Sequence, residues 1–199
     1  MIELIDRITA FYGEIDQLVF QFQLNTGLRC VEHCGGVCCK KEDVHTTVAE
    51  MLPIAHTLLI QGESSLHLEQ IESLPSGSRC TFYVEEGIPP FAGHCAQYAL
   101  RPMICRMFGF AAARNKMGDP RLSTCKLIKQ ADPRTVAYAE GMQSRAPCFS
   151  DLSARLYGLD PSFHSRLLPI NEALKRAISR MGLYLRLSHG EDLGGVSVA

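Results

Sequence analysis

Apolar residues recur at steps of three and four along residues 2–24, which places them on one face of a helix. The expected face comprises Ile5, Ile8, Phe11, Tyr12, Ile15, Leu18, Val19 and Phe22. Glu3 and Asp6 suit the positive N-terminal end of this helix, and Asn-Thr-Gly at residues 25–27 is typical of a stop. The pattern predicts a long amphipathic helix whose apolar face lies in the core.

The same spacing predicts further helices. One runs from residue 42 or 43 to about 60, with a kink or division at Pro53. Others are expected over about 64–73, 133–143, 150–158 and 170–187. Asp132 is expected to cap the helix that begins at Pro133, and Pro102 suits the first turn of a short helix carrying Cys105.

Strand signals are weaker. Residues 82–84 are consistent with a short strand. Residues 108–114 and 121–124 flank a polar turn over 115–120, which is typical of a small hairpin. We therefore predict a mainly α fold: a helical scaffold with cysteine-rich irregular loops and one small β-hairpin.

Composition and charge narrow the class of protein. Of the 199 residues, 46% are hydrophobic and 21% are charged, as in a globular protein with a substantial core. The formal net charge of −1 leaves no basic excess for a phosphate backbone, so no nucleic-acid partner is expected. The first residues are acidic where a signal peptide is basic, and no apolar run approaches the roughly 20 residues of a membrane span. We expect a cytoplasmic protein without a membrane partner.

The nine cysteines are the unusual feature of the composition. A reducing compartment disfavours a disulfide framework, so this number of cysteines indicates metal. Four of them fall within ten residues, at Cys30, Cys34, Cys38 and Cys39, and a second group contains Cys80, Cys95, Cys105 and Cys125. Cys148 stands apart and is expected to be a small buried hydrophobe.

The residues next to the cysteines also indicate a metal site. Gly35 and Gly36 permit the positive φ values of a tight wrap between Cys34 and Cys38. Side chains of neighbours such as Cys38 and Cys39 usually point apart, so the pair serves two sites, or one member binds metal while the other packs. Basic residues adjoin five cysteines, and nearby cations favour thiolate over thiol. These residues are Arg29, Lys40, Arg79, Arg106 and Lys126.

The chain resembles the YkgJ-type cysteine-cluster family, a group of zinc- or iron-chelating domains. The resemblance lies in Cys34-Gly-Gly-Val-Cys38-Cys39, the isolated Cys80, the block Cys95-x-x-Tyr98-x-x-Arg101-Pro102-x-x-Cys105-Arg106-x-Phe108, and Cys125. It implies eight metal-associated cysteines: Cys30, Cys34, Cys38, Cys39, Cys80, Cys95, Cys105 and Cys125. Three residues separate Cys30 from Cys34 and Cys34 from Cys38, whereas family members often have two.

Eight thiolates suit two tetrahedral zinc sites, or one [4Fe-4S] cluster with the remaining cysteines structural. Tyr98, Arg101 and Arg106 are candidates for groups that orient the ligands and balance the charge of the site. His33 and His94 adjoin cysteines, and are expected at the surface or beside the ligands rather than as ligands. Both cofactors stay open at this point.

The sequence thus predicts a metal-binding protein with zinc or an iron–sulfur cluster as its cofactor. The metal is either structural, in a module that binds a protein partner, or part of an iron–sulfur redox or protein-modification enzyme or its accessory. A related cysteine segment occurs in flagellin lysine N-methylases, but this chain lacks a glycine-rich strand–turn–helix for an adenosyl cofactor. No catalytic residue is assigned. We expect one domain over 1–199, with the metal-binding region at 28–126 between helix 2–24 and helices over 132–187.

Overall fold

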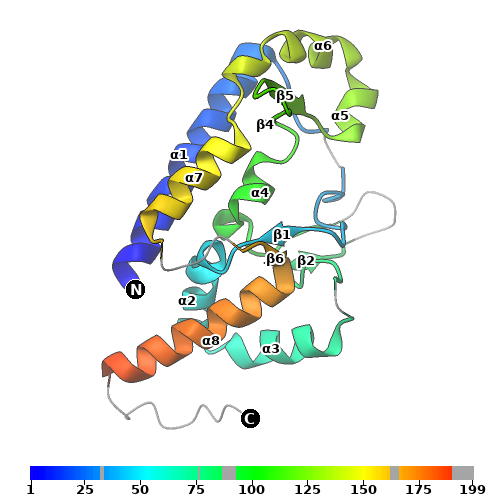
Figure 1. Cartoon of the computed structure of the whole chain (residues 1–199). Helices are drawn as coiled ribbons and strands as arrows, with labels where there is room; N and C mark the ends of the chain where they lie inside the picture. The colour runs from blue at the N-terminus through cyan, green and yellow to red at the C-terminus, as the bar shows by residue number, and fades with distance from the viewer. Residues whose placement is uncertain (32–33, 76, 87–92, 162–165, 190–199) are drawn as a thin grey trace.

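A computed structural model describes residues 1–31, 34–75, 77–86, 93–161 and 166–189 of the chain (Figure 1). These residues form a mainly α fold, which confirms the prediction. The helices are α1 (Ile2–Thr26), α2 (Leu52–Gln61), α3 (Ser64–Ser73), α4 (Met103–Met107), α5 (Lys126–Ala131), α6 (Pro133–Gly141), α7 (Phe149–Leu159) and α8 (Ile170–His189). Short 3-10 turns η1 (Ala49–Met51), η2 (Tyr98–Leu100) and η3 (Gln143–Arg145) connect them.

Three small antiparallel sheets are present in the described residues, and they join segments that are either distant or adjacent along the chain. The pairs are β1 (His45–Thr46) with β6 (Leu168–Pro169), β2 (Tyr83–Val84) with β3 (His94–Cys95), and β4 (Ala111–Arg114) with β5 (Pro120–Ser123). The last pair is the predicted hairpin, and β2 lies within the predicted strand over 82–84. The pairing of β2 with β3 places Tyr83 opposite Cys95.

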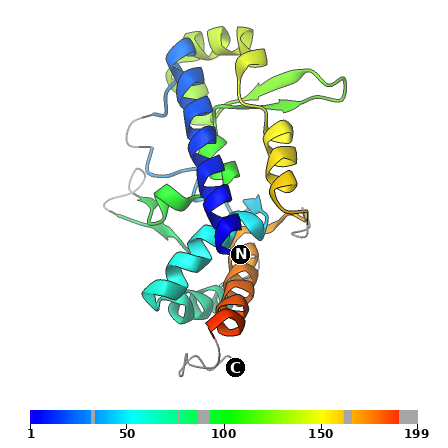
Figure 2. The same cartoon turned by 90° about the vertical axis from the view of Figure 1, so that its left-hand side faces the viewer.

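Helix α1 forms as predicted and extends to Thr26. Its predicted apolar face is buried except for Leu18, whose side chain is 42% exposed. The helix ends at Gly27, which adopts a left-handed conformation (φ 74°) and donates its backbone N–H to the carbonyl of Gln23. Figure 2 shows α1 as a long rod beside α7, and α4 packs against its inner side.

Helices α2, α3 and α8 pack together at one end of the molecule (Figure 1). The predicted helix over 42–60 is wrong in its first part, where β1 pairs with β6 and the carbonyl of Val44 accepts a hydrogen bond from Ile170. The helical segment begins only after Thr47, because Thr47 and Glu50 satisfy each other's backbone N–H groups. This reciprocal cap anchors η1 and α2.

Local signals locate several of the remaining helices. The Asp132 carboxylate accepts a hydrogen bond from the Thr135 backbone N–H (3.0 Å) and caps α6 as predicted. Pro102 is the N-cap of α4, one position before the predicted first turn. Helix α5 was not predicted. Among the described residues, no helix is long and apolar enough to cross a membrane.

Candidate metal centre

All eight predicted cysteines line one cavity of about 390 Å³. They come from the loop after α1 (Cys30, Cys34, Cys38, Cys39), the segment before β2 (Cys80), strand β3 (Cys95), helix α4 (Cys105) and the residue before α5 (Cys125). Cys148 does not line this cavity; its sulfur lies 3.3 Å from the Ser150 hydroxyl at the start of α7. The fold thus gathers sulfurs from five separate segments.

The first cysteine loop is held by two glycines and a tyrosine. Gly35 and Gly36 adopt φ values of 62° and 65°, as predicted for the tight wrap. The Tyr83 hydroxyl donates a hydrogen bond to the Gly35 carbonyl (3.3 Å). A Cβ on Gly36 would lie 2.9 Å from the Gly93 carbonyl oxygen, and one on Gly93 would overlap the Tyr83 hydroxyl at 2.2 Å. Backbone therefore packs directly on backbone at Gly36, and the Tyr83 side chain occupies the space beside Gly93, so both positions favour glycine.

Three of the sulfurs form a hydrogen-bonded group. The Cys39 thiol bonds to the sulfurs of Cys38 and Cys95, which raises the pKa of Cys39. The same bonds lower the pKa of Cys38 to about 6 and that of Cys95 to about 7. Although neighbouring side chains usually point apart, the turn over residues 35–40 brings Cys38 and Cys39 to the same cavity.

A second pair lies nearer the surface. The sulfurs of Cys30 and Cys34 are 4.0 Å apart. Burial, followed by the neighbouring Cys34, raises the pKa of Cys30 to about 11; Cys38 and Cys125 add to the effect. Two thiolates on one tetrahedral ion lie about 3.8 Å apart, because each zinc–sulfur bond is about 2.3 Å long. The Cys30–Cys34 pair is therefore close to the separation that a shared metal requires.

Burial has its clearest effect on the thiols of Cys80 and Cys105. Burial raises the pKa of Cys80 to about 12 and is also the main cause of the raised pKa of Cys105. The expectation that adjacent basic residues would favour thiolates is wrong for these two, for Cys30 and for Cys39, whose pKa values are all raised. Desolvation outweighs charge at Cys30, Cys80 and Cys105, and Arg79, next to Cys80, stacks on the ring of Tyr83 instead.

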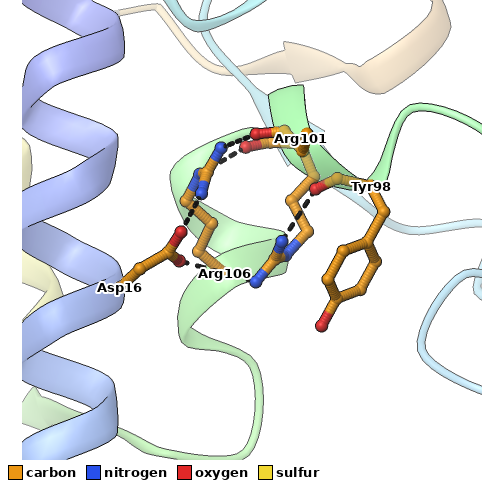
Figure 3. Close-up of polar contacts among 5 residues, drawn as sticks. Asp16, Tyr98, Arg101 and Arg106 are labelled. Carbon is orange, nitrogen blue, oxygen red and sulfur yellow. Dashed lines mark hydrogen bonds and ion pairs between the residues drawn. The ribbon is translucent and has the colours of Figure 1, made fainter.

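Arg106 follows Cys105 in α4 and is almost fully buried. Its guanidinium, with the side chain 3% exposed, pairs with Asp16 of α1 (2.5 Å) and donates to the backbone carbonyls of Arg101 (2.8 Å) and Ala99 (Figure 3). Arg101 lies 3.5 Å from Asp16 and stacks on the exposed ring of Tyr98, with 3.8 Å from its guanidinium carbon to the ring centroid. The sequence did not single out Asp16.

Glu50, which is buried, is another residue that the sequence did not single out. Its carboxylate accepts hydrogen bonds from the backbone N–H of Thr47 (3.0 Å) and of Met103 (3.0 Å), so it joins η1 to the first turn of α4. The buried Tyr12 hydroxyl donates to the Glu50 backbone carbonyl (2.7 Å). Burial raises the pKa of Glu50. The Thr-x-x-Glu spacing at residues 47–50 was the available sequence signal.

The donor set fits a soft metal ion or cluster, because eight thiols from one cavity supply the ligands that zinc and iron–sulfur centres use. Within the described parts of the chain, no three Cys, His, Asp or Glu side chains already converge on a single ion. The sulfurs would therefore shift on binding, exchanging thiol–thiol hydrogen bonds for metal bonds. His94 lines the cavity and its Nδ1 lies 3.3 Å from the Glu86 carboxylate, whereas His33 lies outside the described residues.

Comparison with known proteins gives one match. Residues 29–127, about half of the chain, match the CxxCxxCC family, described as "Putative zinc- or iron-chelating domain". The matched segment runs from the residue before Cys30 to the second residue after Cys125, and so contains all eight cavity cysteines. No curated protein and no solved structure matches the chain.

Proposed function

Residues 29–127 belong to the CxxCxxCC family of zinc- or iron-chelating domains, and from this premise we propose that the eight cavity cysteines are the metal ligands. The observation that carries the proposal is their common position on one cavity wall. Cys148 is excluded from the ligand set because it lies at the start of α7, away from that wall.

More than one metal ion is proposed to bind. A tetrahedral ion uses four thiolates, so eight exceed the need of a single ion. Two zinc ions, or one [4Fe-4S] cluster with the remaining thiols structural, are the two forms that this arrangement accommodates.

The test is the metal content of protein purified anaerobically without a metal-binding tag, together with its absorption spectrum. Zinc or iron with sulfide, retained in stoichiometric amount, is expected. Cys105→Ala should lower the retained metal and Cys148→Ala should not, since only Cys105 lines the cavity. A folded wild-type protein without bound metal after reconstitution, or equal loss in both variants, would refute the proposal.

The identity of the bound metal also distinguishes between two proposed roles of the protein. Colourless protein with zinc supports a structural metal in a module that binds a protein partner. Brown protein with iron and sulfide supports the redox or protein-modification role, as an enzyme or its accessory. A cytoplasmic location and the absence of a nucleic-acid partner belong to the same proposal, because thiols stay reduced in that compartment and the net charge is −1.

A further inference from the structure

Helix α1 lies outside the family segment, which begins at residue 29, yet it forms part of the cavity wall. Val19 and Gln23 of α1 line the cavity beside the cysteines. One turn earlier, Asp16 reaches the two arginines of the Arg-Pro-x-x-Cys-Arg block, Arg101 and Arg106. The contact between α1 and the cysteine region is therefore both apolar and ionic.

Arg106 organises the backbone that leads from β3 to α4. Its Nε donates to the Arg101 carbonyl, and a terminal nitrogen donates to the Ala99 carbonyl, so the chain curls around the guanidinium (Figure 3). The Tyr12 ring covers the same guanidinium at 4.3 Å. This curl sets the position of Cys105, which directly precedes Arg106 in α4.

The charge of Arg106 needs a counter-ion because its side chain is almost fully buried. In Figure 3 the Asp16 carboxylate lies between Arg106 and Arg101 and contacts both. A buried charge that loses its partner is strongly destabilising, since it can recover neither water nor another anion. Asp16 is also 45% exposed, so it remains close to solvent while neutralising the buried group.

Arg101 connects this ion pair to the thiols. It lines the cavity with Cys38 and Cys95, and its side chain is only 15% exposed. A fixed positive charge at this wall stabilises negative charge on nearby thiolates. Both arginines therefore act on the cavity: Arg106 fixes the backbone that carries Cys105, and Arg101 places a positive charge beside the thiols.

We propose that Asp16 is a positioning residue of the metal centre: it fixes Arg106, which places Cys105, and it orients Arg101 beside Cys38 and Cys95. The metal-binding unit accordingly extends beyond residues 29–127 and includes helix α1. This inference rests on the proposed function, because it assumes that the cavity thiols are ligands.

The test compares three variants of the full chain: Asp16→Asn, Asp16→Glu and Glu14→Gln. Glu14 is a matched control, because it lies on the same helix and pairs with Arg155 at 2.5 Å, but does not line the cavity. Cobalt(II) is the probe, titrated into the reduced protein in competition with a chelator. Thiolate-to-cobalt absorption reports the geometry of the site, and urea unfolding without metal reports stability.

Asp16→Asn should weaken cobalt binding at least about tenfold and change the thiolate-to-cobalt absorption, while Asp16→Glu restores most of the affinity. Glu14→Gln should bind as the wild type does. Wild-type affinity and absorption in Asp16→Asn would overturn the inference, even if that variant unfolds more easily. A wild-type protein that binds no cobalt would instead refute the proposed function.

Discussion

Gly36→Ala should weaken metal binding, because Gly36 lies in the loop that carries Cys34 and Cys38 and packs against the backbone of Gly93. A left-handed φ costs an L-residue about 1–2 kcal/mol. The added methyl group would also lie 2.9 Å from the Gly93 carbonyl oxygen and 3.3 Å from the ring of Tyr83. Backbone cannot rotate away as a flexible side chain can, so an overpacking cost of about 1–3 kcal/mol is added.

Gly62→Ala isolates the first of these two costs. Gly62 has a similar φ of 74°, follows α2, and a Cβ there would meet no heavy atom within 4 Å. The two alanine variants share the backbone penalty and differ by the overpacking alone. Without metal, the loop at Gly36 can relieve the overlap by moving away from Gly93. The overlap of the added methyl group then raises the free energy of the metal-bound state, and not that of the metal-free state.

The assay is competition for zinc between each variant and a chromophoric chelator, with urea unfolding of the metal-free proteins as the stability control. A difference of about 1–3 kcal/mol corresponds to a dissociation constant about 5- to 150-fold higher for Gly36→Ala than for Gly62→Ala. Equal dissociation constants for the two variants would refute the reasoning that close backbone packing holds this loop in its binding position.

Three further outcomes are expected. Tyr12→Phe leaves the buried Glu50 carbonyl without its donor and should lower the free energy of unfolding by about 1–3 kcal/mol in urea titration, so an unchanged midpoint would count against this bond. Because burial raises the pKa of Glu50, the folded state holds its proton more tightly; this stabilisation is present below about pH 4.5 and is lost as the pH rises through the folded pKa. Glu50→Gln should therefore show a smaller decline of stability above pH 4.5 than the wild type, and parallel pH profiles would contradict it. Cys30 and Cys80, with pKa values of about 11 and 12, are thiols at pH 7, so zinc loading should release protons to an indicator in weak buffer, and loading without release would exclude them as ligands.

Elements defined by local chemistry were predictable from the sequence. The periodic apolar face predicted α1, and the Asp132-Pro133 pair predicted the start of α6. The hairpin of β4 and β5 was also predictable, because its turn and both strands are adjacent in the chain. In each case the sequence signal lies within a single continuous segment of the chain.

Features that depend on distant segments were not predictable in this way. The sequence predicts helix at β1, and this prediction is wrong because the strand partner, β6, lies more than a hundred residues later. In the sequence, Asp16 has the spacing of an ordinary polar residue on the exposed face of an amphipathic helix. No sequence pattern near Asp16 indicates that it pairs with Arg106. The neighbouring basic residues suggested thiolates, but only the folded structure reveals that desolvation raises the pKa values of Cys80 and Cys105.

The origin of the cavity cysteines in five segments bears on how the chain is held together. Bonds from a shared metal to cysteines between Cys30 and Cys125 would act as cross-links that close long loops. Such cross-links reduce the conformational entropy of the unfolded chain. Their loss would release all five segments together. Chelation should then expose the loop after α1, β3 and the start of α5 to proteolysis in a single step, giving a few large fragments in place of gradual trimming.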